Sequence, residues 1–175
     1  IFTRSELWVA FGVVGTLAIL NLIRDNRVGL IGAFMVMTGG CCLMGAGTMW
    51  YDAGTISGLQ WMIMCGLGSY LAYVPYGSVL FDRLIASTRV MGTAVFVIYI
   101  ADSIGYVGSI SVMAIKDQIA GDMTRLEFFR HLTYGMSGLG VAMLVLSLIY
   151  FLKFHDHGAA TENEIMQGKA AQDAF

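Results

Sequence analysis

The chain alternates long apolar stretches with short polar ones. Five of these stretches are long enough to form a helix across about 30 Å of hydrocarbon, at about 1.5 Å per residue. None shows the strict apolar–polar alternation of a half-buried strand. We therefore expect an all-α transmembrane bundle of about five helices, followed by a polar tail. The helices are expected at residues 7–23, 28–50, 58–81, 90–115 and 132–152, and the tail at 153–175.

One of the apolar stretches contains a carboxylate. Asp102 is the only side chain of 90–115 that ionises near neutral pH. An acid at such a depth costs about 2.5–3.5 kcal/mol on insertion scales, so it usually faces a bundle interior or a water-filled cavity. Ala101, Gly105 and Ser109 form a row of small residues beside it, which predicts a nearby interhelical seam. Asp102 is either a proton-coupling or substrate-binding acid, or a structural polar clamp between helices.

A proline lies near the end of the third expected helix. Pro75 has no N–H and its ring clashes with the carbonyl four residues back, so we expect a kink there. Tyr73 and Tyr76 are three residues apart and share a face, where Tyr106 could meet them. Tyr106 also lies one turn beyond Asp102 and could donate a hydrogen bond to it. The tyrosines form either an aromatic, hydroxyl-lined pathway at a flexible kink or the packing of a bend.

Charged residues gather in the turns between the expected helices. Asp25 and Arg27 lie in the first turn, and Asp82 and Arg83 follow the third helix. An Asp–Arg network there could hold helix ends together in one conformation and release them in another. The alternative is that these are ordinary solvated turn residues. Arg130, at the start of the last helix, is expected to be interfacial.

Composition supports membrane insertion and excludes several other classes of protein. Hydrophobic residues make up 57% of the chain and charged residues 13%, against about 25% charged in soluble domains. The bases are scattered, so no nucleic-acid surface is expected and the lipid bilayer is the expected surrounding. The three cysteines lie in apolar runs and read as packing residues. Without a catalytic motif, we expect no enzyme, catalytic residue, cofactor or metal.

The distribution of Lys and Arg predicts the orientation in the membrane. Six of them fall on the side of the 24–27 turn and the tail, and four on the other side. The excess places the turn and the C-terminus in the cytoplasm. The chain opens on Ile1 without a methionine, and five helices do not form a closed repeat. We therefore expect a fragment that lacks N-terminal helices of the same protein.

Two segments carry a family resemblance. Residues 73–86 (YVPYGSVLFDRLIA) and 96–109 (FVIYIADSIGYVGS) resemble an uncharacterised bacterial family of multi-spanning proteins that is similar to the major facilitator superfamily. The resemblance implies a polytopic transporter-like fold in the bacterial inner membrane and leaves the substrate open. Residues 25–29 (DNRVG) are similar to a degenerate facilitator loop motif, with Asn26 in place of the basic residue and Gly29 one position late. This motif implies that the five helices are the last five of twelve.

The leading functional hypothesis is a secondary transporter of an unknown small solute, proton-coupled through Asp102. The alternative is a non-transporting assembly or sensor subunit, in which Asp102 pairs helices. In the first case the pathway would be lined by Asp102, Tyr106, Tyr73, Tyr76 and Pro75, with a cytoplasmic latch of Asp25, Arg27, Asp82 and Arg83.

Overall fold

The computed structural model describes residues 2–83, 94–119 and 123–172, with side chains for 6–83, 95–116 and 123–153. Over these residues the chain is all-helical, which confirms the predicted fold class. A π-helical turn, η1, follows the third helix. The α-helices are α1 (Phe2–Leu22), α2 (Asn26–Asp52), α3 (Gly58–Pro75), α5 (Ala94–Ile119) and α6 (Arg125–Gln172), and η1 is Tyr76–Leu80.

Four segments of the described chain are long and apolar enough to cross a membrane. They are Asn26–Asp52, Gly58–Arg83, Val95–Lys116 and Arg125–Lys153. The apolar part of α1, Glu6–Leu22, is shorter. These lengths and compositions indicate a membrane protein.

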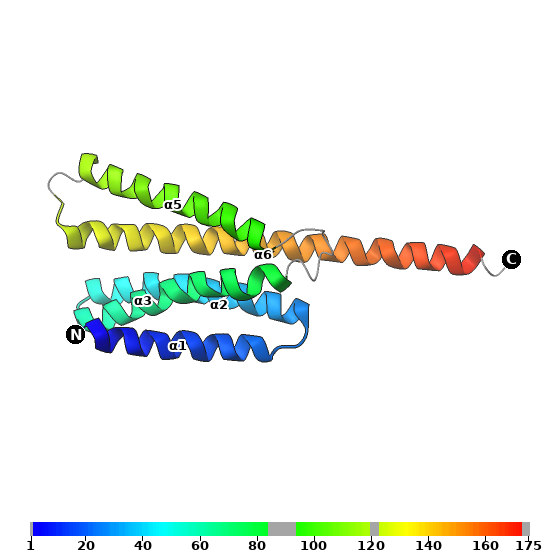
Figure 1. The fold of residues 1–175 in the computed structure, drawn as a ribbon, viewed down its shortest axis with the longest axis horizontal. Helices are drawn as coiled ribbons and strands as arrows, with labels where there is room; N and C mark the ends of the chain where they lie inside the picture. Colours follow the sequence, from blue (N-terminus) through cyan, green and yellow to red (C-terminus); the bar gives the residue numbers. More distant parts are fainter. Residues whose placement is uncertain (1, 84–93, 120–122, 173–175) are drawn as a thin grey trace.

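The helices lie side by side, and α6 extends well beyond the others (Figure 1). It begins at Arg125, ahead of the expected 132, and continues through most of the expected tail to Gln172. A capping box explains the early start: the Thr124 backbone N–H donates to Glu127 Oε2 at 3.0 Å, and the Glu127 N–H donates to Thr124 Oγ1 at 3.3 Å. The expected start of the fourth helix at 90 lies outside the described residues, as do residues 173–175.

The core is built around α2, which packs against both α3 and α6. Leu30, Ala33, Phe34 and Met37 on α2 form a buried cluster with two residues of η1. α1 covers α3 on the far side. α5 stands apart from this body, because none of the residues in its span Val95–Lys116 is buried.

A close backbone contact brings α2 and α3 together. A Cβ added at Gly40 of α2 would lie 2.6 Å from the Gly68 carbonyl oxygen and 2.8 Å from the Ala72 amide nitrogen. Backbone atoms cannot move aside as a side chain can, so only glycine fits. The contact is the small-residue packing that membrane helices use in place of a hydrophobic driving force.

We predict that Gly40→Ala lowers the thermal midpoint of the detergent-solubilised protein. Overpacking of this kind costs about 1–3 kcal/mol. Gly39→Ala is the matched control, because a Cβ at Gly39 meets nothing within 4 Å. That variant should keep or slightly raise the midpoint, since alanine favours a helix by about 1 kcal/mol over glycine. Thermal unfolding of both variants is followed by tryptophan fluorescence. Equal midpoints for the two variants would contradict the close contact.

Candidate functional site

A cleft of about 550 Å³ separates α5 from the rest of the bundle. Four α-helices and η1 contribute to its wall, so it lies where the described helices converge. Its described lining contains one carboxylate and no Lys, Arg or His. The lining residues are Met37, Cys41, Met44, Ser69, Ala72, Tyr73, Tyr76, Ala101, Asp102, Gly105, Tyr106, Ser109, Met136 and Gly140.

The carboxylate of this cleft is Asp102, on α5. The side chain is half-buried, and the Tyr73 hydroxyl of α3 donates to its Oδ1 at 3.3 Å. Asp102 lies seven residues after Val95, about 10 Å into the span at 1.5 Å per residue. The acid is therefore held within the apolar span, turned toward protein rather than toward lipid.

The hydrogen-bond donor differs from the one that the sequence suggested. Tyr106, one turn along the same helix, lines the cleft but remains 73% exposed. Tyr73 reaches the carboxylate from α3 instead. This contact joins two helices, so it depends on the relative position of α3 and α5. The spacing of residues along α5 does not determine that position.

The row of small residues on α5 borders the cleft and not a tight helix contact. Ala101, Gly105 and Ser109 lie along the same wall as Asp102. A Cβ added at Gly105 would meet nothing within 4 Å, whereas one at Gly40 would clash with backbone. The predicted close approach of another helix is therefore not made by the described residues, and the small side chains leave open space beside the acid.

Pro75 ends α3 without ending the helical path of the chain. It is fully buried, and the next residues continue as the π turn η1. Tyr73 and Tyr76 lie near this transition with ring centroids 6.2 Å apart and planes at 27°. The Tyr76 hydroxyl is buried and has no hydrogen-bond partner among the described residues. Single π turns of this kind recur at functional sites.

Arg83, just beyond η1, ties this segment to the turn between α1 and α2. Its guanidinium donates to the Ile23 carbonyl at 2.6 Å, to the Asp25 carbonyl at 3.0 Å and to the Leu20 carbonyl at 3.5 Å. The last carbonyls of a helix lack partners within it, so a cation there satisfies them and opposes the helix dipole. A Cβ at Gly29 would lie 2.7 Å from Arg83 Nε, so the side chain crosses α2 at a glycine.

The four residues of the expected latch are only partly brought together. The Asp25 carboxylate caps α2, accepting from the backbone N–H groups of Arg27 at 2.8 Å and Val28 at 3.2 Å. Arg83 therefore meets Asp25 through its backbone carbonyl and not through its carboxylate. Arg27 and Asp82 are both exposed.

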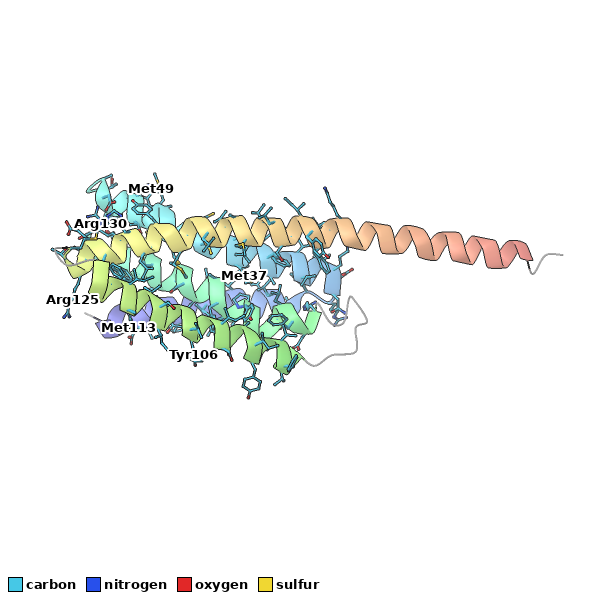
Figure 2. All side chains as sticks on the ribbon, turned by 90° about the horizontal axis from the view of Figure 1, so that it is seen from above. Met37, Met49, Tyr106, Met113, Arg125 and Arg130 are labelled. Atoms are coloured by element: carbon cyan, nitrogen blue, oxygen red, sulfur yellow. The ribbon has the colours of Figure 1, made fainter. Side chains whose placement is uncertain are left out.

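The other end of the bundle holds an ion pair that sequence reasoning missed. Arg130 of α6 forms a salt bridge with Asp52 at the end of α2, and the Tyr134 hydroxyl donates to Asp52 Oδ2 at 2.9 Å. Figure 2 shows Arg130 at this end of α6. Arg130 was expected to be merely interfacial. The available signal was that Asp52 and Arg130 lie at helix ends on the same expected side of the membrane.

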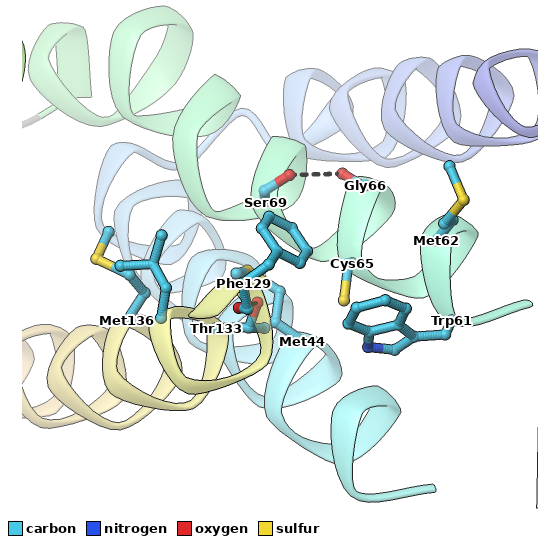
Figure 3. A pocket seen from close by; sticks show the side chains of 10 residues that line it. Met44, Trp61, Met62, Cys65, Gly66, Ser69, Phe129, Thr133 and Met136 are labelled. Carbon is cyan, nitrogen blue, oxygen red and sulfur yellow. Dashed lines mark hydrogen bonds between the residues drawn. The ribbon is translucent and has the colours of Figure 1, made fainter. Parts of the chain in front are cut away.

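A second cavity, of about 520 Å³, lies between α2, α3 and α6 near the same end (Figure 3). Trp61 on its wall is 4% exposed and donates from Nε1 to Thr48 Oγ1 at 3.1 Å. The Trp61 ring stacks on Tyr51 at 4.6 Å and meets Phe129 edge-on at 5.7 Å. The described lining holds no carboxylate or base, so this region reads as a packed seam and not as a site of charge chemistry.

The comparisons with known proteins identify a family without assigning an activity. A model of a family of unknown function, DUF5690, matches residues 1–153. The chain belongs to this family. The match ends with the last candidate span, Arg125–Lys153, so it covers the whole described bundle. No curated protein and no solved structure matches the chain.

We predict that Arg83→Gln destabilises the bundle, because the carbonyls at the end of α1 lose their charged donor. Hydrogen bonds to a charged group contribute about 1.5–3 kcal/mol each in net terms, so the thermal midpoint in detergent should fall. Arg83→Lys should recover only part of the loss, since an ammonium lacks the planar fork of a guanidinium. Arg24→Gln, at an exposed position of the same turn, is the control. If Arg83→Gln and Arg24→Gln have the same thermal midpoint, the hydrogen bonds of Arg83 do not stabilise the bundle.

Proposed function

We propose that this protein is a secondary transporter related to the major facilitator superfamily, and that Asp102 carries the coupling proton. The observation that supports this most directly is the placement of the acid. A carboxylate within an apolar span faces a cleft between helices and holds a hydroxyl from a second helix. Intramembrane acids in such positions are characteristic of proton relays and substrate pathways.

The surroundings of Asp102 give its carboxylate a single described hydrogen-bond donor. Tyr73 donates to it, and the rest of the described lining is mostly apolar. Binding or release of one proton therefore changes the net charge of the cleft. A ligand or proton that interacts differently with two conformations shifts the balance between them, which is the requirement for coupling.

The ends of the bundle offer contacts that such a shift could break. Arg83 ties the end of η1 to the α1–α2 turn, and the Asp52–Arg130 pair joins α2 to α6 at the opposite end. Tyr76 in the cleft is the first residue of the π turn η1, and Arg83 follows three residues after its end. A rearrangement of η1 would therefore move Arg83 against its carbonyl partners, in the manner that alternating access requires.

The orientation follows from the same proposal. The Arg83 end, which also bears Arg24 and Arg27, would face the cytoplasm of a bacterium, together with the C-terminus. The five helices would correspond to the last five of a twelve-helix transporter, and the helices before them would close the other side of the cleft.

One observation favours a second candidate, a non-transporting assembly or sensor subunit. No residue of the α5 span Val95–Lys116 is buried, so a partner helix could cover it. Asp102 would then pair with a cation or a hydrogen-bond donor on that helix. In this case, loss of the carboxylate would change complex formation or abundance and would leave solute flux unaffected.

We predict that Asp102→Asn reduces proton-driven uptake to the level of empty vesicles while the protein still inserts. The amide keeps the size of the side chain but cannot bind and release the proton. The measurement uses full-length protein in proteoliposomes, an imposed pH gradient, and labelled cationic, anionic and neutral solutes. Ser111→Ala is the control, because Ser111 lies on α5 outside the cleft and bonds to Val107 of its own helix.

Normal gradient-driven uptake by Asp102→Asn would refute the role of the proton carrier. Absence of flux for every solute in the unaltered protein, together with loss of a co-purifying partner in Asp102→Asn, would favour the assembly subunit instead. Size-exclusion chromatography of each variant separates both outcomes from misfolding.

A further inference from the structure

The charge of the cleft is not balanced by any base in its described lining. Asp102 is its one carboxylate, and no Lys, Arg or His lines it. Arg83, which follows η1, is already bound to the carbonyls at the end of α1. A carboxylate in an apolar setting is costly unless a positive charge or a proton accompanies it.

Three hydroxyl groups of the cleft are engaged within the protein, whereas the Tyr76 hydroxyl has no partner among the described residues. Ser69 donates to the Gly66 carbonyl at 2.9 Å and Ser109 donates to the Gly105 carbonyl at 3.0 Å, each within its own helix. The Tyr73 hydroxyl donates to Asp102. An anionic ligand would be repelled by the Asp102 charge, with no Lys, Arg or His in the described lining to offset that repulsion.

The remaining wall is suited to a cation with an apolar body. Tyr73 and Tyr76 line the cleft together with the acid, and their ring centroids are 6.2 Å apart. Aromatic faces attract ammonium groups and similar cations through the ring quadrupole. Met37, Met44 and Met136 also line the cleft, and flexible thioethers adapt to irregular apolar shapes.

The geometry points to a monovalent organic cation as the substrate class of this cleft, with Asp102 as its counter-ion. This inference rests on the proposed transport function and deepens it. The cation and the proton bind the same carboxylate, so each displaces the other. Transport would accordingly exchange one cation for one proton across the membrane.

The test compares two ions of nearly identical shape and opposite charge, tetraphenylphosphonium and tetraphenylborate. Their binding to full-length protein in detergent is measured by equilibrium dialysis, with protein-free micelles subtracted. We expect the phosphonium to bind at least about tenfold more tightly than the borate, because like charges in a desolvated contact repel strongly. Acidification should weaken phosphonium binding, since protonation removes the negative charge of Asp102.

Variants identify the site. Asp102→Asn should remove the preference for the cation, Asp102→Glu should keep most of it, and Tyr76→Leu should weaken phosphonium binding by removing a ring face. Ser111→Ala, outside the cleft, should bind as the unaltered protein does. Equal binding of the two ions, or a preference that persists in a folded Asp102→Asn protein, would overturn the inference.

The outcomes separate this inference from the transport proposal. If no cation preference is found but proton-driven uptake of an anion or neutral solute depends on Asp102, the substrate class is wrong and transport stands. If phosphonium binds through Asp102 but no solute moves in proteoliposomes, the site stands and transport fails.

Discussion

The structure depends on a single requirement: a carboxylate carried into an apolar span must find its polar surroundings inside the protein. Asp102 meets it through the Tyr73 hydroxyl, which reaches from α3 to α5. The contact gives α5, whose span has no buried residue, a defined face toward the bundle. The small residues beside Asp102 keep the cleft open, because larger side chains would fill this space.

Around this site the bundle combines a rigid part with a looser one. The rigid part is α2 with α3, held by the Gly40–Gly68 approach that leaves no room for a side chain. The looser part is α5, set across the cleft. Pro75 and the π turn η1 lie between the two along the chain, and η1 begins at Tyr76 of the cleft and is followed by Arg83 at the end of the bundle. Tyr73, the donor to Asp102, thus lies just before a segment with irregular hydrogen bonding.

Hydropathy alone predicts the helical architecture well, because helix length in a bilayer is set by its thickness and each helix satisfies its own backbone. The same reasoning singled out Asp102, since a lone acid is conspicuous in an apolar span. It placed the last helix too late, although Thr124 and Glu127 have the spacing of a capping box. Apolar length alone does not mark the position of this cap.

The contacts between helices were harder to predict. Sequence spacing suggests Tyr106 as the donor to Asp102 and a carboxylate partner for Arg83, whereas the structure has Tyr73 at Asp102 and backbone carbonyls at Arg83. Each observed contact joins segments far apart in the chain, so it depends on the rotation and depth of one helix against another. Periodicity within a single helix carries no information on either quantity.

The proposed role of Asp102 requires that position 102 faces the cleft and not the lipid. The most direct test of this placement uses the full-length protein with its native cysteines replaced by alanine. A single cysteine is introduced at 102 or at 104, and its rate of reaction with a cationic, water-soluble thiosulfonate is measured. Ile104 is 68% exposed and lies outside the cleft. The account predicts that Asp102→Cys reacts at least about tenfold faster than Ile104→Cys, because thiol reactivity follows access to water. Equally slow reaction at both positions, or faster reaction at 104, would contradict it.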